Sequence, residues 1–179
     1  MNDVADWWAT SIIDMEPGHI HIRGHAIQEL IGNMSFPEMI WLMLRGEKPN
    51  EGQVKLLESA LVASVDHGPQ APSIAAARMA VTCGLGLNGA MGTAVNMLDD
   101  VHGGAGQQLV TLLYDLEKKT KLDDKALENF LVLYRKNINP YIPGFGHRFH
   151  KPIDPRAPRL MYLVTEAIKS EIVSGNFMK

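Results

Sequence analysis

The fold class is decided by residues 35–65, which read SFPEMIWLMLRGEKPNEGQVKLLESALVASV. Ser35, followed three residues later by Glu38, has the pattern of a capping box, and Gly46 stands where a helix begun there would end. Asn50 then opens a second segment in which apolar residues recur at steps of three and four. These apolar residues are Val54, Leu57, Leu61, Val62 and Val65. Residues 35–65 therefore predict two consecutive helices joined by a short turn.

Helical spacing continues through most of the chain. It predicts further helices over residues 73–83, 87–100, 106–118, 124–136 and 155–172. Only residues 18–23, where polar and apolar side chains alternate, predict extended backbone, and they suit one short hairpin. The chain is therefore predicted to be all-α apart from that hairpin. Short breaks rich in glycine and proline interrupt the helical pattern at residues 66–72, 102–106 and 137–158.

The composition is that of an ordinary globular chain. Its 179 residues include 17 Lys+Arg and 20 Asp+Glu, a net charge of −3, without a basic stripe that would favour nucleic acid as a partner. Cys83 is the single cysteine, and the first residues lack the basic and apolar regions of a signal peptide, so a cytoplasmic location is expected. Residues 79–98 carry no charge, but their glycines, asparagines and threonines predict closely packed helices and no membrane span.

Each of the three breaks carries a histidine, and the first two place it in a short turn. In Asp66-His67-Gly68-Pro69 the histidine, taken alone, most often has the role of a cap or a surface residue. In His102-Gly103-Gly104-Ala105 the glycines expose the backbone directly before a predicted helix. A ligand oxygen can then approach the amides at the helix N-terminus, although a glycine-rich helix break explains the same residues.

The third break, residues 137–158, contains the most strongly cationic loop of the chain. It includes Gly144-Phe145-Gly146-His147 and leads into a helix predicted to start near Pro155. The basic and titratable side chains after His147 are Arg148, His150, Lys151 and Arg156. Such a group suits a multiply charged carboxylate or phosphate, because arginine binds carboxylates through two parallel hydrogen bonds. A solvated basic loop is the alternative interpretation.

Six segments taken together resemble the citrate synthase superfamily in order and approximate spacing, over nearly the whole chain. They are Ile22-Arg23-Gly24, residues 36–49, Asp66-His67-Gly68, His102-Gly103-Gly104-Ala105, Gly144-Phe145-Gly146-His147-Arg148 and Asp154-Pro155-Arg156-Ala157. Citrate synthases usually have an Asp-His-Glu loop at the first histidine. The Asp66-His67-Gly68-Pro69 loop is more similar to citryl-CoA lyases and to the lyase module of ATP-citrate lyase.

The resemblance implies a carbon–carbon lyase that cleaves citryl-CoA to acetyl-CoA and oxaloacetate through the enol or enolate of acetyl-CoA. Coenzyme A then enters as part of the thioester substrate, and the chemistry requires no metal. The family's roles place His102 as donor to the thioester oxygen and His147 as donor or base at the oxaloacetate carbonyl. The residues implied to bind are His67 and Arg156 for the substrate carboxylates, and Arg148 and Lys151 for coenzyme A.

The resemblance also implies a citrate-synthase-like architecture. It places a large helical domain over residues 1–103 and a smaller one over residues 104–179, and it implies a homodimer through the small-residue-rich residues 73–98. The family's catalytic aspartate lies several dozen residues beyond the Gly-Phe-Gly-His loop, and the chain ends at Lys179. The chain is therefore expected to be C-terminally incomplete, or else a natural short paralogue.

Three alternatives remain open at this stage. Citrate synthase, which joins an acyl-CoA to oxaloacetate, uses the same scaffold and the same enolate. A non-catalytic partner subunit would bind dicarboxylate and CoA without the catalytic aspartate. A metal protein would use His19, His21 and His25, although no cysteine or nearby acid completes a familiar ligand set.

Overall fold

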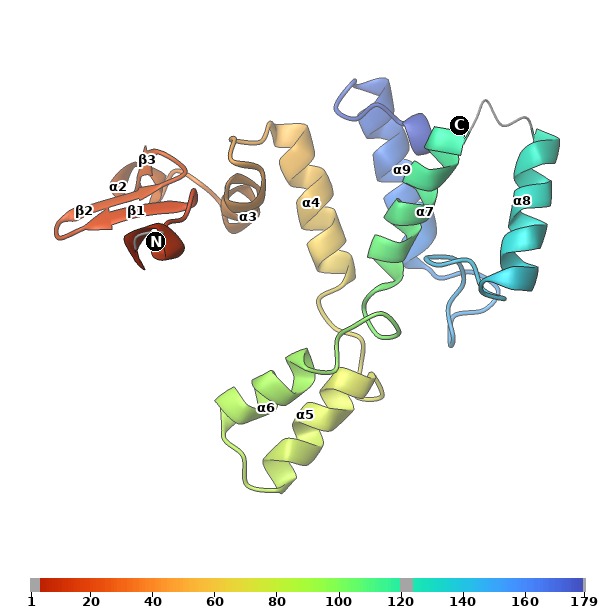
Figure 1. Cartoon of the computed structure of the whole chain (residues 1–179), viewed down its shortest axis with the longest axis horizontal. Coiled ribbons are helices and arrows are strands. Elements are labelled where there is room, and N and C mark those ends of the chain that lie inside the picture. Colours follow the sequence, from red (N-terminus) through yellow and green to blue (C-terminus); the bar gives the residue numbers. More distant parts are fainter. Residues whose placement is uncertain (1–3, 120–123, 179) are drawn as a thin grey trace. The chain divides into compact units, whose positions relative to one another are not determined.

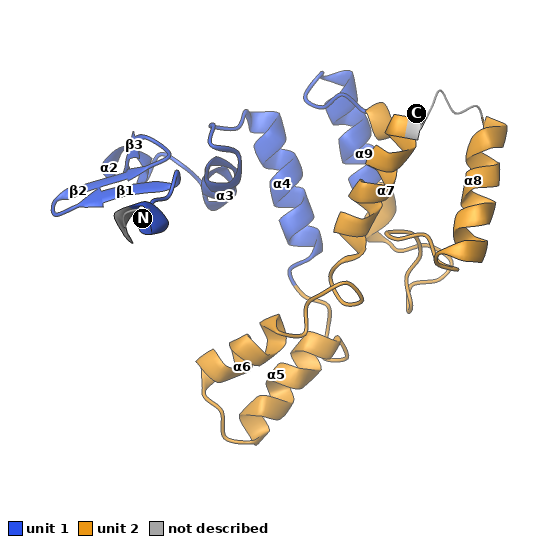
Figure 2. Cartoon of the chain, viewed as in Figure 1, with its two compact units in different colours: residues 1–65, 159–175 blue, residues 66–158, 176–179 orange. Residues whose placement is uncertain are grey.

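The structure, a computed structural model, describes residues 4–119 and 124–178, and the chain divides into two compact units (Figure 2). Unit 1 comprises residues 1–65 and 159–175, and unit 2 comprises residues 66–158 and 176–179. The division of the chain into domains at residue 103 stays a prediction, since these two units are divided at other points of the chain.

Unit 1 opens with a short helix and a small antiparallel sheet (Figure 1). Helix α1 (Val4–Trp8) precedes β1 (Ile13–Glu16), β2 (His19–Ile22) and β3 (His25–Ala26), which pair in the order β1-β2-β3. Ile13 pairs with Ile22, and His21 pairs with both Asp14 and Ala26. The extended backbone predicted at residues 18–23 is confirmed in β2, and its hairpin partner β1 lies before the predicted range. Strand β3 and helices α1 and α2 (Ile27–Leu30) were not predicted, because elements of two to five residues are too short to show a period.

Arg23, from the Ile22-Arg23-Gly24 segment, connects this sheet to the next helix. Its Nη2 donates to the Met43 carbonyl at 2.7 Å, and its Nη1 donates to the Ser11 carbonyl at 3.2 Å. The Met43 carbonyl belongs to the last turn of α3 (Phe36–Arg45), where backbone carbonyls lack partners inside the helix. Arg23 therefore has a structural role at this helix end.

The two helices predicted from residues 35–65 are confirmed. Helix α3 begins with the predicted capping box, in which Ser35 N–H donates to Glu38 Oε2 at 2.6 Å, and ends at Gly46 in the left-handed conformation. Helix α4 (Glu51–Ala63) begins with a second capping box between Asn50 and Gln53. Both helices start where the sequence places a side chain that accepts from a free backbone N–H.

Helix α9 (Arg156–Lys169) is shorter than the predicted 155–172. Glu171 adopts a left-handed φ of 56°, and Ile172 N–H donates to the Ala167 carbonyl at 2.9 Å, which is the bond pattern of a Schellman motif. Glutamate is an unusual residue for this position, so the sequence lacked the glycine that normally signals the end of a helix.

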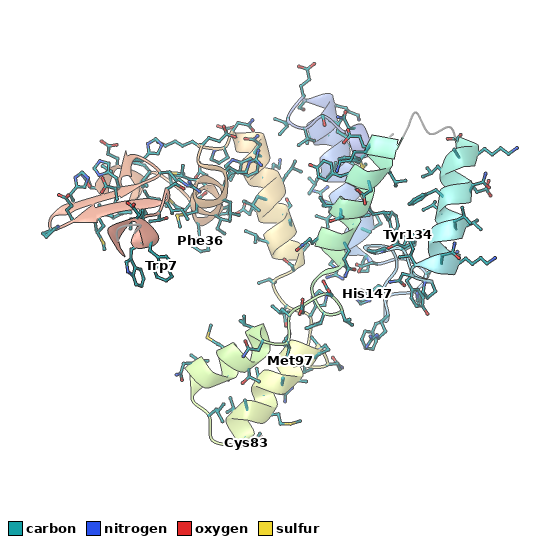
Figure 3. The ribbon with its side chains drawn as sticks, viewed as in Figure 1. Trp7, Phe36, Cys83, Met97, Tyr134 and His147 are labelled. Carbon is teal, nitrogen blue, oxygen red and sulfur yellow. The ribbon has the colours of Figure 1, made fainter. Side chains whose placement is uncertain are left out.

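Unit 2 contains the remaining helices. Helices α5 (Pro72–Thr82) and α6 (Leu87–Val95) pack side by side as an antiparallel pair, and Figure 3 shows Cys83 and Met97 at its opposite ends. Helices α7 (Ala105–Lys119) and α8 (Asp124–Asn137) follow, and the 3₁₀ turn Asn176–Met178 lies against α7 through an edge contact of Phe177 with Tyr114 at 5.5 Å. In the described residues no helix is both long and apolar enough to cross a membrane.

The helix predicted over residues 87–100 ends early, at Val95. Met97 and Leu98 make tighter bonds, to carbonyls three residues back, and Asp99 N–H then donates to the His102 carbonyl at 3.0 Å. The predicted C-terminal turn of this helix is therefore wrong, because its residues instead close the loop that carries His102.

The described residues form a sparse core. Leu42 is the one large side chain that is fully buried, with Ala26, Leu30, Ala90, Leu112 and Ala167 nearly so. Many large apolar side chains of the α5–α6 pair are exposed instead. They are Met79, Val81, Leu85, Leu87, Met91, Val95, Met97 and Leu98. This pair therefore presents an apolar surface of the kind that mediates contacts with other chains or segments.

Candidate active site

The His102 loop connects α6 to the first turn of α7. Asp99 N–H donates to the His102 carbonyl, and Gly104 N–H donates to the Asp99 carbonyl, both at 3.0 Å. Gly103 adopts a φ of 110°, a conformation that side chains rarely allow. The consecutive glycines predicted to expose the backbone therefore make a tight loop that holds His102 just before α7.

The His102 ring is anchored at the N-terminus of α5. Its Nε2 accepts a hydrogen bond from Ser73 N–H at 3.3 Å and lies 2.9 Å from Ser73 Oγ. A ring nitrogen that accepts from an amide carries no proton, so the proton of the neutral imidazole lies on Nδ1. His102 is thereby set up as a neutral hydrogen-bond donor through Nδ1.

Ser73 was not identified as a site residue from the sequence. The pattern Pro72-Ser73 predicts the start of a helix and nothing about a site. The contact of Ser73 with His102 joins residues 29 positions apart in the chain. Local spacing does not report such a contact.

Gly104→Ala is expected to displace the His102 loop. A Cβ at this position would lie 2.8 Å from Asp100 Cα and 2.9 Å from the Asp100 carbonyl oxygen, and a backbone has little freedom to move away. We expect a loss of about 1–3 kcal/mol in unfolding free energy, measured by urea denaturation. Gly106→Ala is the matched control, since nothing lies within 4 Å of its Cβ. Equal stability of the two variants would contradict this account of the loop.

The His147 loop connects α8 to α9 along the chain, and its Gly144 lies against α7. Gly144 has a φ of 78°, and a Cβ there would lie 2.7 Å from Leu109 Cδ2 of α7. A side chain at residue 144 would therefore separate the loop from the helix. Glycine at this position fixes the Gly-Phe-Gly-His segment against the helix that follows the His102 loop.

The His147 ring also has a defined proton position. Its Nδ1 accepts hydrogen bonds from the backbone N–H groups of Phe149 and His150, both at 3.1 Å. Partial burial is the main cause that lowers the pKa of His147; His150, Arg156 and His67 add to it, and Asp154 opposes it. The neutral ring therefore carries its proton on Nε2, as a donor that points away from the loop backbone.

His67 lies close to His147, as the family resemblance implies for a shared site. The two rings are 6.3 Å apart between centroids. Asp66 Oδ1 accepts from Gly68 N–H at 2.9 Å, which holds the turn that carries His67. The structure thus brings His67 and His147 together. Among the described residues, His102 shares no hydrogen bond or ring contact with these two histidines.

Arg156 pairs with Asp154 through two parallel hydrogen bonds. Arg156 Nε donates to Asp154 Oδ1 at 2.9 Å, and Nη2 donates to Oδ2 at 2.6 Å. Asp154 Oδ1 also accepts from the Arg156 backbone N–H at the start of α9. These bonds to Arg156 hold the pKa of Asp154 far below its usual range. The binding of a substrate carboxylate by Arg156 stays a prediction, and this pairing orients its guanidinium.

Asp154→Asn is expected to lower stability in a pH-dependent way. A carboxyl whose pKa is lowered by folding stabilises the folded state above its ordinary pKa of 3.8, and this contribution is lost as the pH falls below that value. The difference in unfolding free energy between parent and variant should therefore be full at pH 7 and shrink below pH 3.8. Urea denaturation at pH 7, 4 and 2.5 measures it, with Glu166→Gln in the exposed pair with Lys169 as control. A difference that is constant over this range would contradict the pairing.

Arg148 and Lys151, implied to bind coenzyme A, lie on the same loop. Both are exposed, and within the described residues neither makes a hydrogen bond or an ion pair. Their contact with coenzyme A stays a prediction. Both side chains are accessible to a ligand.

One group of side chains in the described residues brings three possible metal ligands within 4.8 Å of one another: His147, His150 and Asp154. The hydrogen bonds of these three side chains disfavour the binding of a cation. The Nδ1 lone pair of His147 accepts from two amides, and the Asp154 carboxylate is engaged by Arg156. Together with the cationic neighbours, this arrangement favours an anion over a metal ion.

The alternative metal site of His19, His21 and His25 does not assemble in the described residues. The rings of His19 and His21 stack at 4.0 Å, and His19 Nε2 lies 3.4 Å from Asp14 Oδ2. His25 does not join them in a group of three ligands within bonding range. His19 and His21 therefore share one face of the hairpin, and His25, which pairs with Ile22, lies on the other face.

Comparison with known proteins agrees with this arrangement. A sequence model of the family described as "citrate synthase, C-terminal domain" matches residues 1–55 and 40–174. The citrate synthase of Haloferax volcanii is 31% identical over 116 residues, which are 64% of this chain and 29% of that protein. The citrate synthase of Acidithiobacillus ferridurans is 32% identical over 119 residues, 64% of this chain and 28% of that protein.

Solved structures with a similar fold include lyases. The citryl-CoA lyase of Hydrogenobacter thermophilus superimposes with a TM-score of 0.78 at 32% identity, over 89% of this chain and 60% of that one. The ATP citrate lyase of Methanothrix soehngenii, solved with citrate and coenzyme A, gives 0.78 at 20% identity, over 89% of this chain and 26% of that one, which shows the shared fold. The chain thus spans 60% or less of the length of these relatives.

These matches confirm the helix-dominated, citrate-synthase-like fold that the six segments implied. The family match covers all three histidine loops and the hairpin, so the resemblance extends over residues 1–174. The chain belongs to the citrate synthase family.

Proposed function

We propose that this chain carries the donor groups of a lyase that cleaves citryl-CoA into acetyl-CoA and oxaloacetate. The observation that carries the proposal is the pair of neutral imidazoles: His102 with Nε2 engaged by Ser73, and His147 with Nδ1 engaged by two amides. Each ring keeps one N–H for a ligand oxygen. A carbon–carbon cleavage through an enolate needs two such donors, one for each oxygen that gains or loses charge.

The proposed reaction runs as a reverse condensation. The tertiary hydroxyl of citryl-CoA gives its proton to a base, and the adjacent carbon–carbon bond breaks. The electron pair of that bond forms the acetyl-CoA enolate, whose carbon then takes a proton to give acetyl-CoA. His102 Nδ1–H stabilises the enolate oxygen, and His147 Nε2–H hydrogen-bonds to the oxygen that becomes the oxaloacetate carbonyl. His67 and Arg156 bind the carboxylates, and Arg148 and Lys151 bind the coenzyme A part of the thioester.

Two observations favour the lyase direction. The loop Asp66-His67-Gly68-Pro69 is of the citryl-CoA lyase type, and a solved citryl-CoA lyase matches 89% of this chain at 32% identity. Citrate synthase is the second candidate, because curated relatives at 31% and 32% identity are citrate synthases. Both candidates use the same two imidazole donors.

One assay with citryl-CoA separates these activities. A lyase releases oxaloacetate, detected by coupled reduction to malate, and leaves the CoA thioester intact. A synthase-type enzyme hydrolyses citryl-CoA and releases a free thiol, detected with a thiol reagent. Binding of oxaloacetate by calorimetry without either product would indicate the non-catalytic partner subunit. The absence of both turnover and binding would overturn the proposal.

We propose further that a second copy of the chain covers the apolar surface of the α5–α6 pair. Val81 is 54% exposed, Leu87 77% and Met91 60%, on helices that carry small residues suited to close approach. Sedimentation equilibrium of the parent and of Met91→Glu tests this. A dimer that the charged side chain dissociates is expected, and a monomeric parent would contradict it.

A further inference from the structure

We propose that His150 is the proton acceptor for the tertiary hydroxyl of citryl-CoA, an inference that rests on the lyase function proposed above. The reaction needs a group that takes the hydroxyl proton as the carbon–carbon bond breaks. The hydrogen bonds of the described residues determine which side chain near His147 can take it.

His147 itself is a poor acceptor. Its Nδ1 lone pair is occupied by the N–H groups of Phe149 and His150, so Nε2 already carries the ring proton. To take a further proton at Nδ1, the ring would have to give up both hydrogen bonds, and a substrate oxygen would have to enter the loop backbone. His147 therefore donates to the oxygen without removing its proton.

Asp154 is engaged as well. Both carboxylate oxygens accept from Arg156, and these bonds favour the charged form of the carboxyl so strongly that it has little tendency to take a proton. His67 lies farther away, with its ring 6.3 Å from that of His147 between centroids. The remaining titratable side chain beside His147 is His150.

The position of His150 suits a base that works next to a donor. Its ring stacks on that of His147 at 4.6 Å between centroids and 29° between planes. A ring nitrogen of His150 lies within 4.8 Å of a ring nitrogen of His147, so the two rings are close enough to act on neighbouring parts of one substrate group. The His150 side chain is exposed, and within the described residues its ring nitrogens make no hydrogen bond.

The proton balance is complete with these groups. A ring nitrogen of His150 takes the hydroxyl proton, the oxygen becomes the carbonyl of oxaloacetate, and the electron pair of the broken bond forms the acetyl-CoA enolate. The enolate carbon takes a proton from an acid or from water, and the His150 imidazolium returns its proton to solvent. The titratable groups that interact with His150 are His147 and Asp154, and Arg156 and His67 act on the neighbouring His147.

Substitutions at His150 separate this role from loop structure. The bond to His147 Nδ1 comes from the backbone N–H of His150, so His150→Gln and His150→Ala both retain it. We expect kcat for citryl-CoA cleavage to fall by about 10²–10⁴-fold in both, while the Kd for oxaloacetate stays within threefold. Added imidazole should restore part of the activity of His150→Ala, and the acid limb of the kcat–pH profile should disappear in His150→Gln.

The results of these experiments distinguish a failure of the His150 role from a failure of the proposed lyase function. The exposed hairpin residue His19 provides the control, and His19→Gln should keep parental kcat. If the parent cleaves citryl-CoA and His150→Gln does so within threefold, the inference about His150 is wrong and the lyase function stands. A lower kcat that imidazole does not restore, with the acid limb of the kcat–pH profile unchanged, also overturns the inference. A residue with only a structural role would give that result. A parent without cleavage overturns both.

Discussion

His147→Asn is expected to abolish most citryl-CoA cleavage, with kcat lower by about 10²–10⁴-fold, in a protein that stays folded. Asparagine places an oxygen near the position of Nδ1, so it can still accept from the N–H groups of Phe149 and His150 and hold the loop. It has no donor at the position of Nε2. The variant therefore removes the proposed hydrogen bond to the substrate oxygen and keeps the local structure.

Steady-state kinetics and the thermal unfolding midpoint together test this expectation. His147→Ala should lose the same activity and should also loosen the loop, since it removes the acceptor as well. The exposed His19, changed to alanine, controls for loss of an imidazole elsewhere. Cleavage by His147→Asn at a rate within threefold of the parent would show that Nε2–H has no part in the reaction.

His102→Gln is expected to lower kcat by about 10²–10³-fold. The glutamine oxygen can reach the place of Nε2 and accept from Ser73 N–H, so the anchor at the start of α5 is retained. The Nδ1–H donor is lost, and with it the stabilisation of the enolate oxygen. Because that stabilisation exists only as the enolate develops, we expect the loss in kcat with little change in the Kd for the CoA thioester.

Ser73→Ala is expected to lower kcat less than His102→Gln does. It removes the Oγ contact at 2.9 Å but leaves the backbone N–H that keeps Nε2 free of a proton. A loss of about tenfold is expected, the size of one hydrogen bond. If Ser73→Ala were as damaging as His102→Gln, the backbone N–H would be too weak to set the tautomer. Parental kcat in His102→Gln would contradict the donor role altogether.

The helices and strands whose ends are set by residues a few positions apart could be predicted from the sequence. Ser35, Glu38 and Gly46 specify the start and the end of α3 through contacts within a few residues, and the structure has the helix at those bounds. The alternation in residues 18–23 likewise located strand β2, but not its partner β1 at Ile13–Glu16. The ends of α6 and α9 were not predictable, because they depend on the closure of the His102 loop and on a glutamate in the left-handed conformation.

Capping residues, helical spacing and short motifs act over a few positions of the chain, so the fold class, the family and the three histidine loops could be predicted from the sequence alone. Part of the chemistry of the site depends on contacts between segments that are far apart in the chain. Ser73 meets His102 across 29 residues, and His67 meets His147 across an even longer separation. The bond from Ser73 N–H determines which ring nitrogen of His102 carries the proton, whereas the His147 proton is placed by the nearby amides of Phe149 and His150. Hydrogen bonds between distant segments leave no period in a sequence, so only the folded chain reveals them.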